Sequence, residues 1–109
     1  MTFTKGIGSP SYMAPEVLNK EHYKKPADIY AFAITMLEVF TWNEAYPKSQ
    51  FRFPWMIAEF VTKGQRLNLD IVEPSVKKII EMCWQQYPTE RLKIEDVVAL
   101  LETEYIKQN

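Results

Sequence analysis

Apolar side chains recur at helical spacing along three stretches of the chain. Between residues 27 and 41 they leave almost no polar face, so a helix here needs cover on all sides. Residues 75–86 show the i, i+3, i+4, i+7, i+8 pattern of an amphipathic helix, with Pro74 at or near its first position. Residues 94–105 carry a further apolar stripe on one face. The apolar positions of the three stretches are Ile29, Phe32, Ala33, Met36, Leu37 and Phe40; Val76, Ile79, Ile80, Cys83 and Trp84; and Ile94, Val97, Val98, Leu101 and Tyr105.

Two shorter helices complete the predicted elements. Pro15 fits the first turn of a short helix that ends at Leu18, because its missing N–H is not needed there. Residues 54–63 form the other helix, which Gly64 is expected to end in the left-handed conformation common at helix C-termini. The predicted total is therefore about four to five helices.

Loops precede and separate these helices. Residues 1–14 gather glycine, serine and proline, and residues 42–52 are polar enough to predict an exposed loop. No alternating pattern of any length predicts a strand, and no segment repeats. The predicted fold class is all-α, a helical bundle with an N-terminal loop, forming one unit over residues 1–109.

The tryptophans are predicted to be packing residues rather than ligand stackers; they are Trp42, Trp55 and Trp84.

Composition and charge exclude several classes of partner. An apolar fraction of 47% is that of a packed domain and not of a disordered chain. The formal net charge of -1 gives no attraction toward nucleic acid or an anionic membrane surface. The longest apolar run, residues 29–42, contains Glu38 and is shorter than the roughly 20 residues that a bilayer crossing needs. We expect neither nucleic acid nor a membrane among the partners.

Cysteine usage indicates a reducing, cytoplasmic location. Cys83 is the single cysteine, so no internal disulfide can form, and no Cys/His cluster has metal-ligand spacing. The residues after Met1 lack the basic start and apolar run of a signal peptide. Cys83 itself is expected to be a small core hydrophobe and not a nucleophile.

The opening stretch carries a family signature. Residues 8–16, GSPSYMAPE, resemble the end of the activation segment of protein kinases, which closes on A-P-E. Further matches follow in the family's order: Asp28-Ile29-Tyr30-Ala31-Phe32-Ala33 is similar to D-x-W-S-F-G, Lys63-Gly64-Gln65-Arg66-Leu67 to a kinase turn, and Cys83-Trp84 with Pro88 and Arg91 to C-W…P…R. By this resemblance the whole chain is identified as a partial protein-kinase C-terminal lobe, in the tyrosine-kinase-like branch.

The resemblance implies an ion pair and an anchor. Glu16 of A-P-E would pair with Arg91, because a bidentate carboxylate–guanidinium pair holds a loop to a distant helix with fixed geometry. Two unpaired surface charges are the alternative. Asp28 resembles the aspartate that holds the catalytic-loop backbone in kinases. Its alternative is an acid that stabilises the positive end of its own helix.

The resemblance also implies a loop that faces the substrate, the P+1 loop. Gly8, Ser9 and Tyr12 occupy positions of this loop, with the hydroxyl of Ser9 placed as in kinases of the Ser/Thr type. Tyrosine-specific kinases usually carry tryptophan where this chain has Tyr12, so Ser/Thr specificity is expected. A turn residue bonded to its own backbone is the alternative for Ser9.

The complete family domain transfers phosphate from ATP, with Mg²⁺, to protein hydroxyls. It needs a glycine-rich loop, H-R-D and D-F-G, and none of these occurs here. The glycines are Gly6, Gly8 and Gly64, and the single histidine, His22, is followed by tyrosine. We therefore expect no catalytic, cofactor-binding or metal residue in this chain, and no activity from it alone.

A non-catalytic interaction module derived from a kinase lobe is the alternative function. The apolar helix over residues 27–41 would then dock on a protein partner, on the missing portion of a kinase, or on a second copy of the chain, because large apolar patches mark interfaces. In the full domain, the partner implied by the resemblance is a protein substrate.

Overall fold

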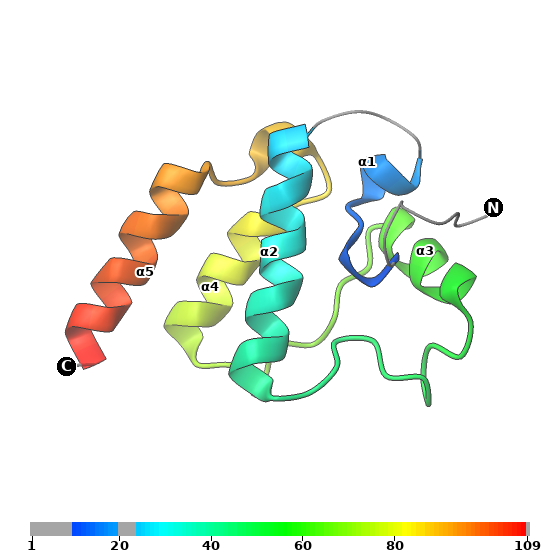
Figure 1. Ribbon diagram of the computed structural model, residues 1–109, viewed down its shortest axis with the longest axis horizontal. Coiled ribbons are helices and arrows are strands. Elements are labelled where there is room, and N and C mark those ends of the chain that lie inside the picture. Colours follow the sequence, from blue (N-terminus) through cyan, green and yellow to red (C-terminus); the bar gives the residue numbers. More distant parts are fainter. Residues whose placement is uncertain (1–9, 20–23, 109) are drawn as a thin grey trace.

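The computed structural model describes residues 10–19 and 24–108. Within these ranges all regular structure is helical, so the predicted all-α class is confirmed. The elements are η1 (Pro10–Tyr12), α1 (Pro15–Leu18), α2 (Lys24–Thr41), α3 (Pro54–Thr62), α4 (Pro74–Cys83), η2 (Pro88–Glu90) and α5 (Ile94–Gln108). Helix α2 runs through the middle, with α4 along it, α5 outside α4, and α1 and α3 together on the other side (Figure 1).

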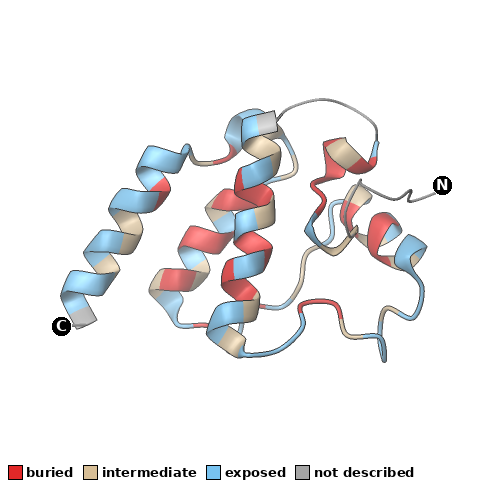
Figure 2. Cartoon of the chain, viewed as in Figure 1, coloured by how far each residue is buried: buried red, intermediate tan, exposed pale blue. Residues whose placement is uncertain are grey.

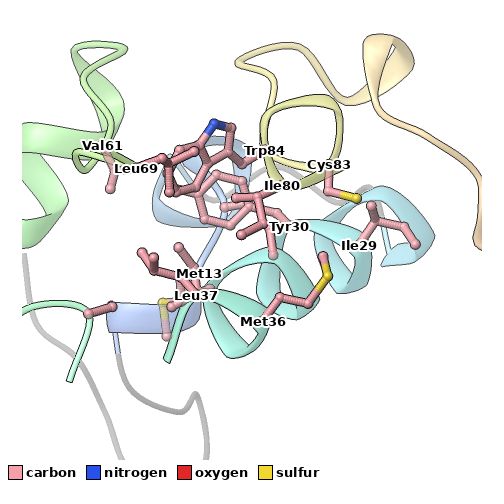
Figure 3. Close-up of a cluster of buried hydrophobic side chains, with 14 of the residues drawn as sticks. Met13, Ile29, Tyr30, Met36, Leu37, Val61, Leu69, Ile80, Cys83 and Trp84 are labelled. Atoms are coloured by element: carbon pink, nitrogen blue, oxygen red, sulfur yellow. The ribbon is translucent and has the colours of Figure 1, made fainter. Parts of the chain in front are cut away.

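One hydrophobic core joins the two central helices. Helices α2 and α4 pack together, and both carry buried residues, coloured red in Figure 2, that belong to the same hydrophobic cluster. Figure 3 shows Tyr30 and Ile80 meeting inside this core, with Trp84 above them. All five apolar positions predicted for the amphipathic helix of α4 and its end are buried, so that prediction is confirmed; they are Val76, Ile79, Ile80, Cys83 and Trp84.

Helix α2 begins at Lys24, earlier than the predicted start at residue 27. Pro26 therefore lies inside the first turn instead of preceding the helix. The first N–H groups of any helix have no carbonyl partner within it, so a proline there removes no hydrogen bond.

Helix α4 ends earlier than predicted, at Cys83. The chain leaves the helix at Trp84, whose φ and ψ are -112° and 30°. The carbonyl of Trp84 accepts a hydrogen bond from Arg66 Nε at 2.9 Å, and the carbonyl of Gln85 accepts one from Arg91 Nε at 2.9 Å. Guanidinium groups thus satisfy carbonyls at the end of α4, where a helix lacks its own donors.

Helix α3 ends as predicted, in a left-handed glycine. Gly64 has φ of 89°. Its N–H donates to the carbonyl of Val61 at 3.0 Å, and the next N–H, of Gln65, donates to Phe60 at 3.1 Å. This pair of bonds is the Schellman motif.

The tryptophans do not all pack. Trp84 is buried as predicted, but Trp42 is 89% exposed and Trp55 is 56% exposed, so the prediction is wrong for those two. Trp42 also has a positive φ, 58°, and its N–H donates to the carbonyl of Glu38 at 2.8 Å. It occupies the left-handed position after α2 that glycine usually fills.

The loop over residues 42–52 is not wholly exposed, contrary to the prediction. Ala45 and Tyr46 are buried. The ring of Tyr46 meets that of Phe51 edge-on at 5.0 Å, and Phe51 meets Phe60 of α3 at 5.2 Å. This small aromatic cluster holds the loop against α3, a contact that the local sequence pattern does not reveal.

The cover expected around α2 is incomplete within the described residues. Phe32, Val39 and Phe40 are 36%, 55% and 50% exposed. Of the stripe predicted on α5, Val97 is buried, but the remaining members are exposed or half-buried: Ile94, Val98, Leu101 and Tyr105. The helices α2 and α5 therefore retain apolar surface.

Among the described helices, none has the length and apolar character that a membrane crossing requires.

Candidate functional site

A buried ion pair joins the start of the described chain to its C-terminal part. Arg91 Nη1 lies 2.7 Å from Glu16 Oε2, and Arg91 Nη2 lies 2.7 Å from Glu16 Oε1. The two side chains are 0% and 2% exposed. This is a bidentate, fully desolvated pair, and not two surface charges. The structure thus brings together two residues that lie 75 positions apart.

Arg91 ties further segments to this pair. Its Nη1 also donates to the carbonyl of Pro26 in α2 at 2.9 Å, and its Nε donates to the carbonyl of Gln85 after α4 at 2.9 Å. One guanidinium therefore connects α1, the first turn of α2 and the end of α4. A buried charge of this kind is tolerated because its N–H groups are satisfied.

A second guanidinium, that of Arg66, lies beside the first. Both Arg66 and Arg91 lie over the ring of Tyr30, each with its central carbon 5.2 Å from the ring centroid. Arg66 Nη2 also donates to Gln86 Oε1 at 2.9 Å, and burial lowers the pKa of Arg66. The sequence placed Arg66 in the Lys63–Leu67 turn motif but gave its side chain no role, because its partners come from distant segments.

Tyr30 and Tyr46 bury their hydroxyl groups in this region. Neither hydroxyl makes a hydrogen bond of ordinary geometry among the described residues, but the two phenols interact with each other. Burial raises the pKa of both side chains. Both phenols therefore stay neutral beside the guanidinium groups.

Tyr12 is held by Glu38 of α2. The Tyr12 hydroxyl donates to Glu38 Oε1, and the N–H of Ala45 donates to Glu38 Oε2 at 2.9 Å. The hydrogen bond to Glu38, followed by burial, raises the pKa of Tyr12. Glu38 thus joins η1 to the loop after α2. The other predicted residues of the substrate-facing loop, Gly8 and Ser9, lie outside the described residues.

Asp28 lies apart from Tyr12, in the first turns of α2. It is exposed and lines a cavity of about 760 Å³ between that part of α2 and the start of α5. Lys25, Lys93, Ile29 and Leu92 also line this cavity. Arg91 also borders this cavity, so the cavity adjoins the ion pair with Glu16.

The contacts of this site hold chain segments in place. The ion pair, the two arginines over Tyr30 and the Tyr12–Glu38 bond fix the path of the chain around α2. Within residues 10–19 and 24–108, no group of three or more histidine, cysteine, aspartate or glutamate side chains converges as metal ligands would.

Comparison with known proteins adds a family match. The family model described as protein tyrosine and serine/threonine kinase matches residues 3–101. The chain is 35% identical over 102 residues to RGS domain-containing serine/threonine-protein kinase A of Dictyostelium discoideum, a match that covers 92% of this chain and 9% of that protein.

Two further relatives also match most of this chain but only a small part of their own length. Serine/threonine-protein kinase WNK3 of Mus musculus is 41% identical over 95 residues, which cover 84% of this chain and 5% of the relative. Dual specificity protein kinase shkA of Dictyostelium discoideum is 33% identical over 96 residues, which cover 87% of this chain and 18% of that relative. The chain thus spans less than a fifth of the length of each of these relatives.

Proposed function

Because the chain belongs to the protein tyrosine and serine/threonine kinase family, we propose that it is the C-terminal lobe part of a kinase catalytic domain, from the late activation segment onward. In the tyrosine-kinase-like branch, that domain transfers the terminal phosphate of ATP to serine or threonine hydroxyls of proteins. The chain contributes the substrate-facing loop and the helical scaffold of this reaction, as one unit over residues 1–109.

The observation that carries this proposal is the buried pair of Glu16 and Arg91. A substrate loop can orient a protein hydroxyl only if its own backbone is held, because misplacing the reacting group by about 1 Å costs on the order of 100-fold in rate. The bidentate pair fixes α1, which directly follows the loop, onto the end of α4. A pair that served solubility alone would lie at the surface.

Specificity for serine and threonine is supported by Tyr12. Its ring is fixed by Glu38 at a position where tyrosine-specific members of the family usually carry tryptophan. Two of the relatives are named serine/threonine kinases and one is named a dual specificity kinase. Gly8 and Ser9 precede Tyr12 in the sequence and are assigned to the same substrate-facing loop by the resemblance to the family.

Asp28 is assigned the role of an anchor for the catalytic-loop backbone. Its carboxylate is exposed beside a cavity, where a backbone segment from the rest of the domain has room to donate N–H groups to it. ATP and Mg²⁺ are held by parts of the domain other than this chain, because the sequence contains no G-x-G-x-x-G, H-R-D or D-F-G.

A chimera tests the proposal. The chain replaces the matching segment of the Dictyostelium kinase A, and phosphate transfer to serine and threonine of a generic protein substrate is measured. The chimera should be active, and the same chimera with Arg91→Ala should lose most activity. A folded chimera that stays inert beside an active parent would contradict the assignment. The isolated chain, titrated with Mg-ATP in a calorimeter, should show no saturable heat.

A non-catalytic interaction module is the second candidate, and one observation favours it. The exposed apolar side chains of α2 and α5 suit a permanent protein partner, including a kinase portion supplied in trans. Binding of a hydrophobic dye together with a sizing column separates the cases. A dye-negative monomer argues against a docking role for these faces, and a stable assembly that excludes the dye argues for it.

A further inference from the structure

The start of α3 presents aromatic side chains to solvent in a fixed arrangement. The rings of Phe53 and Trp55 are nearly parallel, at 8°, with their centroids 6.3 Å apart. The guanidinium carbon of Arg52 lies 5.5 Å from the centroid of Phe53. Phe53 is 47% exposed and Trp55 is 56% exposed. We call Arg52, Phe53 and Trp55 the aromatic platform.

The platform is held rigidly by the helix that follows it. Phe53 is the N-cap residue of α3 in an extended conformation, and Pro54 fixes the first helical position. The carbonyl of Phe53 accepts a hydrogen bond from the N–H of Met56 at 2.9 Å. The opposite face of α3 is anchored in the core by three buried side chains: Ile57, Ala58 and Val61. A preorganised surface of this kind loses little conformational entropy on binding.

The charges that flank the platform in the sequence are of one sign. Lys48 and Arg52 are the only charged residues between Glu44 and Glu59. In the part of the chain that the structure describes, no carboxylate pairs with either cation, whereas Glu59 already pairs with Lys63 at 3.1 Å. The chain as a whole has a net charge of -1, so this positive region is local. This local positive charge is complementary to carboxylates on a partner protein.

We propose that the aromatic platform is a docking surface for an extended acidic segment of a partner protein. The carboxylates of that segment meet Lys48 and Arg52, and its prolines or other apolar residues stack on Trp55. Arginine and tryptophan are the residue types that carry most binding energy at protein interfaces. The docking goes beyond phosphate transfer, and only the argument from the nearby substrate loop rests on the proposed function.

Two other classes of partner fit the surface less well. An interfacial membrane helix needs a continuous apolar face, but the apolar face of α3 is buried in the core of this protein. Nucleic acid binding needs a broad basic surface, and two cations do not provide one. The position of the platform also favours a protein, since α3 packs against η1 and α1, the segments next to the proposed substrate loop (Figure 1).

Fluorescence anisotropy of the full chain tests the proposal. The probe is a fluorescein-labelled peptide of alternating aspartate and proline, and a lysine–proline peptide of the same length is its control. Saturable binding is expected for the acidic peptide alone. Arg52→Glu and Trp55→Ala should each weaken it by about tenfold. Lys78→Glu makes the same charge change on the exposed side of α4 and should alter affinity by less than about twofold.

Several results would overturn the docking surface. They are equal binding of the lysine peptide, no binding of the acidic peptide, or equal losses in the Arg52→Glu and Lys78→Glu variants. Binding to phosphatidylserine vesicles in the absence of peptide binding would assign the platform to a membrane surface instead. Helical circular dichroism of each variant verifies that the changes, all at exposed positions, leave the fold intact.

Discussion

Three buried side chains carry polar groups that the core does not fully use. Tyr30 and Tyr46 each bury a hydroxyl that makes no hydrogen bond of ordinary geometry among the described residues and interacts only with the other phenol, and Cys83 buries a thiol. An unsatisfied buried hydroxyl costs about 1–3 kcal/mol of desolvation free energy. Burial also makes ionisation of such groups harder, so the stability of the fold depends on pH at the alkaline end.

Tyr46→Phe should raise the free energy of unfolding by about 1 kcal/mol. The substitution keeps the ring that packs against Phe51 and removes only the orphaned hydroxyl. Denaturant unfolding measures the change, with Tyr87→Phe at an exposed position as the control that should stay within about 0.5 kcal/mol. A clear loss of stability in Tyr46→Phe would mean that the interaction of this hydroxyl with Tyr30 stabilises the fold.

The thiol of Cys83 predicts a loss of stability above pH 9. Burial raises its pKa to about 11 from an ordinary value of 9.0. In that interval the unfolded chain releases the proton and the folded chain keeps it, so the free energy of unfolding falls as pH rises and is unaffected below pH 9. Cys83→Ala should show a shallower fall between pH 9 and 11. If the free energy of unfolding falls equally with pH in the original chain and in Cys83→Ala, the thiol is not the cause.

At the scale of elements, helix ends decide where the chain turns. Two helices end in a left-handed residue, glycine after α3 and tryptophan after α2. Glycine adopts this conformation freely, whereas a side chain costs roughly 1–2 kcal/mol. The exposed side chain of Trp42 makes little contact that would offset this cost.

The two positions therefore give opposite predictions for the free energy of unfolding. Trp42→Gly should raise it by about 1 kcal/mol, because glycine relieves the backbone strain. Gly64→Ala should lower it by about 1 kcal/mol through strain alone, since an added Cβ would meet only Gln86 Oε1, at an ordinary 3.8 Å. Thermal unfolding of both variants provides the comparison. A destabilised Trp42→Gly protein would show that the indole is held by contacts within the fold.

The elements also show what the sequence could predict. The stripe of α4 predicted its buried face correctly, because that face meets α2 directly, and Gly64 predicted the end of α3. The early end of α4 could not be predicted, since it depends on guanidinium donors from other segments. Likewise Glu38 interrupts an apolar run in the sequence, and its bonds to Tyr12 and Ala45 exist only in the folded chain.

The residues of the site were predicted from the resemblance to the kinase family and not from hydrophobic periodicity. Glu16 and Arg91 stand far apart in the sequence, and only the family motifs suggested their pairing. The structure adds the extent of burial and the carbonyl of Pro26 as a further partner. Arg66 escaped prediction because a single arginine in a turn has no local feature that marks a core position.

At the scale of the whole molecule, a well-packed centre contrasts with uncovered outer helices. The core around α2 and α4 is closed, while α5 and one side of α2 retain exposed apolar side chains. A chain of this kind is stabilised mainly at its centre. The buried pair of Glu16 and Arg91 spans that centre, since it joins the first described segment to the connection before α5.

A double-mutant cycle on this pair tests the account most directly. Glu16→Gln, Arg91→Met and the double variant are unfolded in denaturant. Each single change should cost about 3–5 kcal/mol because it leaves a buried partner without its counterpart, and the coupling energy should be about 2 kcal/mol or more. A coupling energy below about 0.5 kcal/mol would show that the pair does not hold the loop to the helical core, and would contradict the account.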